Sequence, residues 1–131
     1  MSREQPQIAI VDDDAAVREA LGDLLQVGGF AGQAYNSAVG FLEDYVPGRF
    51  DRVIPDLRMP HMDGVELLQR LNATSAAPPA LVITSAPDAF TRALAIRNGA
   101  VDCLSKPVED DFLLQLVASL VGVSGTSRPE C

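Results

Sequence analysis

With 131 residues, 47% of them hydrophobic, the chain is long and apolar enough to fold as one domain, which excludes an intrinsically disordered chain. Its 18 acidic and 10 basic residues give a formal net charge of −8, which repels polyanions and argues against direct nucleic-acid binding by this segment. It has no apolar run of about 18 residues that could span a membrane and no signal-peptide-like start, and we expect no disulfide between Cys103 and Cys131, so a cytoplasmic location is expected.

Short apolar runs alternate with amphipathic helical patterns, so that a strand is followed by a helix five times along the chain. In chain order, the strands are expected at residues 7–11, 30–35, 52–55, 80–83 and 101–105. The helices are expected before Gly28-Gly29, over 39–45, from Asp63-Gly64 to the break at 76–79, over 88–98 and over 109–121. The expected core-facing positions are Val17, Leu21, Leu24 and Leu25 in the first helix, Val65, Leu68 and Leu71 in the third, and the stripes Phe112-Leu116-Leu120 and Leu113-Val117-Val121 in the last.

This alternation predicts right-handed crossovers and a flavodoxin-like, doubly wound α/β fold, with a five-stranded parallel sheet between five helices. The first and third runs are continuously apolar, which is typical of strands buried on both faces. Among doubly wound sheets we choose the strand order 2-1-3-4-5, because it places strands 1 and 3 at the switch point where ligands bind. The domain is expected to span residues 1–121, and residues 122–131 are interpreted as a tail or the start of a linker.

Four of the five expected strands end in residues that phosphate and metal chemistry can use. These residues are Asp12-Asp13-Asp14, Asp56, Thr84-Ser85 and Lys106, the only lysine of the chain. Because the carboxyl ends of parallel strands lie on one edge of the sheet, we expect these residues to share one pocket. Two or three carboxylates held that close favour a bound cation, and hard oxygen ligands suit Mg²⁺.

The same residues indicate what such a pocket can do. Lys106 offers a point charge for a phosphate group, and Thr84 offers a hydroxyl donor. With a metal neutralising the charge, one carboxylate can act as a nucleophile and become an aspartyl phosphate. Asp56 is the hardest to explain structurally, because an acid that closes a central apolar strand has no obvious packing role.

Several of these residues also have a structural interpretation when each is taken alone. Asp12 to Asp14 can cap the first helix, and Thr84-Ser85 can cap a helix or form a turn. Asp63-Gly64 is interpreted as a turn and helix start without a chemical role, and His61 as an exposed loop residue. Only the combination of strand ends therefore favours a functional site.

The segment Asp56-Leu57-Arg58-Met59-Pro60-His61-Met62-Asp63-Gly64 resembles the phosphoacceptor loop of receiver domains in bacterial two-component response regulators. The resemblance covers roughly residues 7–121, and its other motifs are Ile10-Val11-Asp12-Asp13-Asp14, Thr84, Asn98-Gly99-Ala100-Val101-Asp102 and Lys106-Pro107. The sequence looks most similar to receivers that precede helix-turn-helix output domains, and this similarity implies a role in transcription regulation.

The resemblance implies a role for each strand-end residue. Asp56 would be the phosphorylation site. Asp13, Asp56 and the backbone carbonyl of Arg58 would bind Mg²⁺, with Asp12 acting largely through water. The phosphoryl group would be held by two further residues, Thr84 and Lys106. A cis peptide would join Lys106 to Pro107.

The resemblance also implies partners and a switch. The domain would take its phosphoryl group from a phosphohistidine on a sensor histidine kinase and would remove it again with an in-line water. It would thus be a signalling switch with self-catalysed phosphotransfer and not an enzyme acting on a separate substrate. Phosphorylation would pull Thr84 inward and reshape the face of the fourth helix, fifth strand and fifth helix, which would control a C-terminal or separate output domain. The sequence leaves open whether that face also forms a homodimer.

Two positions, Cys103 and Pro55, depart from the family pattern, and Ala86 is also informative. Cys103 stands where the family usually has Tyr or Phe, and we interpret it as an ordinary buried cysteine. Pro55 precedes the phosphoacceptor and removes a ladder donor, so it should perturb the strand end or create a bulge and slow phosphotransfer. Ala86 leaves the path of the attacking water open, which predicts that the phosphorylated state is not very long-lived.

Two other functions remain open at this point. A pseudo-receiver would have the same fold but would work as a binding module without phosphorylation, because Pro55 and Cys103 had disabled the switch. An enzyme of the flavodoxin-like class is a weaker alternative. A haloacid-dehalogenase phosphatase would have an acid where this chain has Arg58, and a flavin protein would have a Ser/Thr/Gly phosphate loop where this chain has three aspartates.

Overall fold

The computed structural model describes residues 5–57, 64–74, 77–84, 88–106 and 109–120. Within these ranges each of five strands is followed by a helix, as the sequence predicts. The strands are β1 (Gln7–Val11), β2 (Ala31–Tyr35), β3 (Arg52–Pro55), β4 (Ala80–Thr84) and β5 (Ala100–Ser105). The helices are α1 (Ala15–Val27), α2 (Ala38–Asp44), α3 (Gly64–Asn72), α4 (Ala89–Arg97) and α5 (Asp110–Leu120). Searching the described residues for a helix with the length and apolar character to cross a bilayer finds none.

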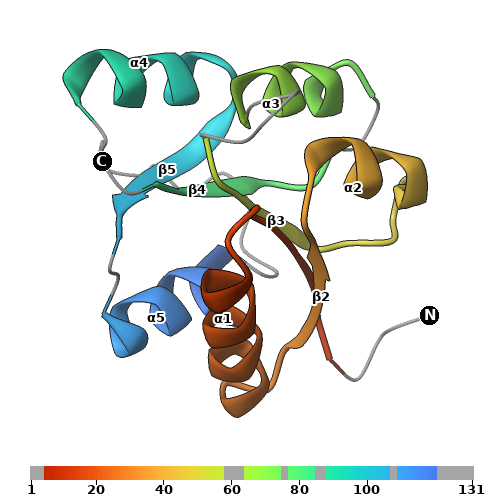
Figure 1. Cartoon of the computed structure of the whole chain (residues 1–131), viewed down its shortest axis with the longest axis vertical. Helices are drawn as coiled ribbons and strands as arrows, with labels where there is room; N and C mark the ends of the chain where they lie inside the picture. Colours follow the sequence, from red (N-terminus) through yellow and green to blue (C-terminus); the bar gives the residue numbers. More distant parts are fainter. Residues whose placement is uncertain (1–4, 58–63, 75–76, 85–87, 107–108, 121–131) are drawn as a thin grey trace.

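All five strands form one parallel sheet in the order β2-β1-β3-β4-β5, which confirms the predicted order (Figure 1). The strands β1 and β3 lie side by side, and the chain winds outward from them in opposite directions. Helices α1 and α5 cover one face of the sheet, and α2, α3 and α4 cover the other (Figure 1). The fold is therefore the doubly wound α/β fold, with its switch point between β1 and β3.

The hydrophobic core forms because side chains of the central strands alternate between the two faces. From β1, Ile8 and Ile10 pack against Leu25 of α1 and Leu113 of α5. Ala9 and Val11 point to the opposite face of the sheet and pack against α2 and α3. Every residue of β3 and β4 is buried, whereas the middle of the edge strand β2 is exposed. The continuous apolar runs of the sequence thus correspond to strands covered on both faces.

Side-chain caps define where three of the helices begin. The capping carboxylates and hydroxyl accept hydrogen bonds from backbone N–H groups in the first helical turn, as N-caps do. The pairs are Asp14 with Ala16 (2.9 Å), Ser37 with Gly40 (3.0 Å) and Asp88 with Thr91 (2.7 Å). Of the three aspartates that follow β1, the capping role thus belongs to Asp14.

One expected core position of the last helix is wrong. Phe112 is 46% exposed, whereas Leu113, Leu116 and Val117 are buried. At about 100° per residue, Leu113 lies between Leu116 and Val117 at the centre of the buried face of α5, and Phe112 points about 100° away from Leu113. Residues 121–131, which include the predicted tail, lie outside the described residues.

Pro55 was predicted to disturb the end of its strand, and the β-ladder of β3 is irregular only on the side that faces β4. Toward β1 the ladder is regular through the pair Val11 and Pro55, and the Asp56 N–H donates to the Val11 carbonyl at 2.8 Å. Toward β4 the described register contains only the pair Val53 and Ala80. Because donors alternate along a strand, the N–H that Pro55 lacks is the next one after Val53 to face β4. Proline therefore weakens the β3–β4 pairing without a bulge toward β1.

Alanine at position 99 is expected to destabilise the turn between α4 and β5 by about 1–2 kcal/mol. Gly99 has φ +104°, and a Cβ added to it would lie 2.2 Å from the Asn72 side-chain nitrogen. Urea denaturation of Gly99→Ala measures the loss. The matched control is Gly48→Ala, because Gly48 has φ +87° and no atom within 4 Å of its added Cβ. A larger loss for Gly48→Ala than for Gly99→Ala would show that the contact with Asn72 contributes nothing.

Tyr35, the last residue of β2, titrates far above the usual range. Burial, and then the hydrogen bond to Asp44 and its negative charge, raise the pKa of Tyr35 to about 12, while Arg49 opposes this rise. The phenol is therefore favoured in the folded state over the phenolate.

The consequence for pH dependence follows from the direction of this shift. The contribution of Tyr35 to stability is fully present below the unfolded pKa of 10.0 and is lost as pH rises through about 12. We expect the difference in ultraviolet absorbance between the wild type and Tyr35→Phe to titrate with a midpoint near 12. In Asp44→Asn the midpoint should fall toward 10.0, and an unchanged midpoint would refute the role of the carboxylate.

Candidate functional site

The hydrogen-bond ladders of the sheet continue beyond the strands and place the predicted residues at one edge. Asp12 follows β1, Asp56 follows β3, Thr84 ends β4 and Lys106 follows β5. The Lys106 N–H donates to the Thr84 carbonyl at 2.8 Å, just as the Asp56 N–H donates to β1. Backbone hydrogen bonds between neighbouring strands therefore fix the positions of Asp56 and Lys106 relative to those strands.

The lysine side chain joins two of the strand ends through ion pairs. Lys106 Nζ lies 2.9 Å from Asp12 Oδ2 and 3.5 Å from Asp56 Oδ2. Both carboxylates are buried, with Asp12 3% and Asp56 6% exposed. A buried carboxylate requires a charge partner, so the ammonium group neutralises part of the negative charge that burial would otherwise make costly.

The ionisation of Lys106 reflects this arrangement. Burial acts against the charged ammonium, but the hydrogen bond to Asp12 and the charge of Asp56 together outweigh it and raise the pKa of Lys106. The lysine is therefore a permanent cation at neutral pH, fixed beside two carboxylates.

Three carboxylates form a cluster of the kind that holds a divalent cation. Oxygen atoms of Asp12, Asp13 and Asp56 all lie within 4.8 Å of one another. Asp13 is exposed, so the cluster is open to solvent on its side. Hard oxygen donors with open positions fit Mg²⁺, which binds through one or two carboxylates and keeps several waters. The residues present thus fit the ion that the sequence predicts.

Thr84 is fully buried at the end of β4. Among the described residues no hydrogen-bond partner reaches its Oγ1. A buried hydroxyl costs free energy when it is unpaired. Thr84 lies next to Lys106 at the end of the neighbouring strand, so its hydroxyl is suited to donate a hydrogen bond to a ligand oxygen.

Two hydrogen bonds that hold Asp12 were not predicted from the sequence, and one of them comes from Arg18, a residue that the sequence did not indicate. Arg18 of α1 donates from Nη1 to the Asp12 carbonyl at 2.8 Å, and the Asp14 N–H donates to Asp12 Oδ1 at 2.9 Å. Asp12 is thereby held through both its backbone and its side chain. No spacing rule connects an arginine on a helix to the carbonyl of a residue six positions earlier, so the sequence carried no signal for it.

Gly64, interpreted from the sequence as a turn and helix start, also supports the site. Its N–H donates to the Leu57 carbonyl at 3.0 Å. A Cβ added to it would lie 2.4 Å from the Asp56 carbonyl oxygen and 2.8 Å from the Leu57 Cα. The start of α3 can therefore approach the backbone of Asp56 only because residue 64 has no side chain.

Six predicted residues lie outside the described residues. Their roles in metal or phosphate binding, loop structure, water access and peptide geometry therefore stay predictions. They are Arg58, His61, Asp63, Ser85, Ala86 and Pro107.

Comparison with known proteins decides the family. Residues 8–118 match the model of the response regulator receiver domain. The chain belongs to this family. Phosphorylation-based switching is the general function of its members, and they generally bind Mg²⁺ at the acidic pocket.

Relatives of this receiver are transcriptional regulators and response regulators. It is 42% identical over 115 residues to the transcriptional regulatory protein FixJ of Bradyrhizobium diazoefficiens, covering 87% of this chain and 56% of that protein. It is also 42% identical over 113 residues to the response regulator protein FleR of Pseudomonas aeruginosa, covering 86% of this chain and 24% of that protein. The chain thus spans about half or less of the length of these relatives.

Solved structures agree with this assignment. The crystal structure of FixJ-N has a TM-score of 0.80 and 34% identity, with 96% of this chain and 100% of that chain covered. The response regulator StyR has a TM-score of 0.81 and 36% identity, with 89% of this chain and 59% of that chain covered.

Two of the departures from the receiver pattern, Cys103 in β5 and Pro55 at the end of β3, fall on described residues. Cys103 is 2% exposed and packs in an apolar cluster with Leu57, Leu68 and Val82, which fits the interpretation as an ordinary buried cysteine. Pro55 leaves the β1 side of its strand regular. The acidic cluster and the lysine are in place together, so these findings do not favour a pseudo-receiver.

Proposed function

We propose that this receiver is phosphorylated on Asp56 by a sensor histidine kinase. The observation that carries the proposal is the convergence of Asp12, Asp13, Asp56 and Lys106 from three strand ends. A carboxylate oxygen of Asp56 would attack the phosphorus of the phosphohistidine. A P–O bond would form while the P–N bond breaks and the imidazole leaves.

The surrounding residues would stabilise the transferred group. Asp13, Asp56 and the Arg58 carbonyl would hold Mg²⁺, with Asp12 acting largely through water, and the ion would neutralise charge on the phosphoryl oxygens. Lys106 would pair with one of these oxygens, and the buried Thr84 hydroxyl would donate to another. An in-line water would later hydrolyse the aspartyl phosphate and reset the domain.

We further propose that the signal leaves through the face of α4, β5 and α5. Movement of Thr84 toward the phosphoryl group would reshape this face, which would then control an output domain or form a homodimer. Exposed apolar side chains on both helices, Phe90 at 75% and Phe112 at 46% exposure, support an interaction surface here. In the cell, the domain would act in the cytoplasm alongside its kinase.

Intact mass measurement after incubation with acetyl phosphate and Mg²⁺ tests the phosphorylation site. We expect one phosphoryl group on the wild type and none on Asp56→Asn. The control Asp23→Asn removes an exposed carboxylate of α1 and should be labelled like the wild type. A wild type that neither gains the group nor binds beryllofluoride would refute the proposal and favour a pseudo-receiver.

A further inference from the structure

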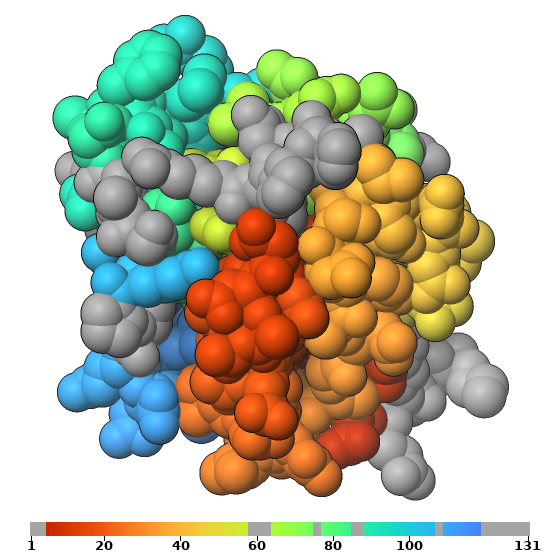
Figure 2. All heavy atoms as spheres, viewed as in Figure 1, coloured from red at the N-terminus to blue at the C-terminus, as the bar shows by residue number. Residues whose placement is uncertain are grey.

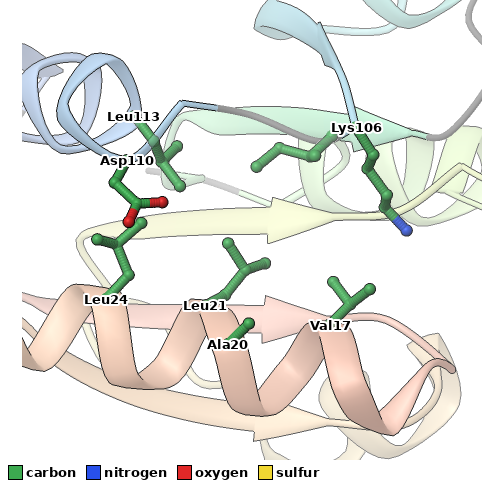
Figure 3. Close-up of a pocket in the computed structure, with 8 residues that line it drawn as sticks. Val17, Ala20, Leu21, Leu24, Lys106, Asp110 and Leu113 are labelled. Atoms are coloured by element: carbon green, nitrogen blue, oxygen red, sulfur yellow. The ribbon is translucent and has the colours of Figure 1, made fainter.

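A cavity of about 450 Å³ lies between α1 and α5, next to the side chain of Lys106 (Figure 3). One wall is an apolar stripe of α1 with helical spacing, formed by Val17, Ala20, Leu21 and Leu24. The volume falls within the range of small-molecule sites, which are concave, largely apolar and supplied with a few polar groups.

The other wall comes from the sheet and from α5. Ile83 and Leu113 are buried at its base. Helix α5 lies beside α1 (Figures 1 and 2). Of the α1 side chains that line the cavity, Val17, Leu21 and Leu24 are only partly buried and Ala20 is exposed. Side chains that line such a space lack dispersion contacts on one side, and apolar cavities of this kind accept apolar guests.

The polar groups of the cavity select the charge of a ligand. Lys106 contributes only its aliphatic stem, because its ammonium group pairs with Asp12 and Asp56. Asp110, at the start of α5, is exposed and directs its carboxylate toward α1 (Figure 3). The charged acceptor that the lining offers is therefore a carboxylate, in a chain of net charge −8.

We propose that this cavity binds a small organic cation, with an apolar body against α1 and a protonated amine on Asp110. The apolar stripe would supply the contact area, and the carboxylate would set the sign of the charge. Binding would need no phosphoryl group, so the inference stands apart from the proposed phosphorylation.

Titration of the isotopically labelled chain with 4-phenylbutylamine, followed by NMR, tests the site. We expect saturable shifts at Ala20, Leu21 and Leu113, with a dissociation constant on the order of a few millimolar for so small a probe. The neutral 4-phenylbutan-1-ol should bind about two- to fivefold more weakly, because it lacks the ion pair. The anionic 4-phenylbutanoate should bind more weakly still.

Three variants separate the site from general attraction to an acidic protein. Asp110→Asn should weaken amine binding about two- to fivefold. Asp111→Asn removes the same charge from the next position of α5 and should bind like the wild type. Ala20→Phe should fill the cavity and abolish the shifts at Leu113. Equal affinity for amine and carboxylate, equal losses in Asp110→Asn and Asp111→Asn, or shifts outside the cavity would overturn the proposal.

Discussion

Replacement of Gly64 by alanine is expected to lower the free energy of unfolding by about 2–4 kcal/mol. The new methyl group would lie 2.4 Å from the Asp56 carbonyl oxygen and 2.8 Å from the Leu57 Cα. Both are backbone atoms, so neither can rotate away, and α3 must shift from the sheet or displace the segment that carries Asp56. Urea denaturation measures the loss of stability, and the rate of labelling by acetyl phosphate should fall as well.

A second glycine provides the control for this prediction. Gly22 lies within α1, and no atom is found within 4 Å of an added Cβ. Gly22→Ala should therefore stabilise the protein by about 0.5–1 kcal/mol, because alanine is the better helix former. If Gly64→Ala were as stable as the wild type and labelled at the same rate, the close approach of residue 64 to the Asp56 backbone would not be needed for stability or for phosphorylation.

Replacement of Lys106 by methionine is expected to destabilise the metal-free protein by about 2–3 kcal/mol. The variant keeps most of the aliphatic stem but leaves Asp12, 3% exposed, and Asp56, 6% exposed, without the shared ammonium group. Thermal unfolding in the presence of a chelator measures this loss. The exposed pair Glu66 and Arg70 serves for comparison, and Arg70→Met should cost only about 0.3–0.5 kcal/mol.

Magnesium should compensate more in this variant than in the wild type. Without the lysine the carboxylate cluster is more negative, so it should bind a divalent cation more tightly. Binding to the folded state alone raises stability in proportion to the logarithm of ligand concentration over the dissociation constant. The rise in melting temperature on addition of Mg²⁺ should therefore be larger for Lys106→Met than for the wild type. Equal rises would indicate that lysine and metal do not act on the same carboxylates.

The predictable part of this molecule follows from local patterns and from one rule of topology. Apolar runs and caps located every strand and helix, because buried strands and capped helices impose their own residue types. The parallel arrangement then brought Asp12, Asp56, Thr84 and Lys106 to one edge, since all strands of such a sheet end on the same side.

What could not be predicted depends on contacts between distant segments. Gly64 appears in the sequence as an ordinary turn residue, and only the packing of α3 against the β3 end shows why it cannot carry a side chain. The hydrogen bond from Arg18 to Asp12 and the cavity beside Lys106 likewise depend on how α1 lies against its neighbours. Phe112 was misplaced because a helical stripe defines a direction but not how far the neighbouring elements extend to cover it.

The single lysine of this chain makes the site a spectroscopic reporter. Selective isotopic labelling of lysine places one side-chain ammonium signal in the whole protein, and that ammonium is the one bonded to Asp12 and Asp56. Its resonance can be followed without assignment while a metal ion, a phosphoryl mimic or a ligand is added. A spectrum with a single lysine peak would therefore report the charge state and the ionic partners of Lys106 directly.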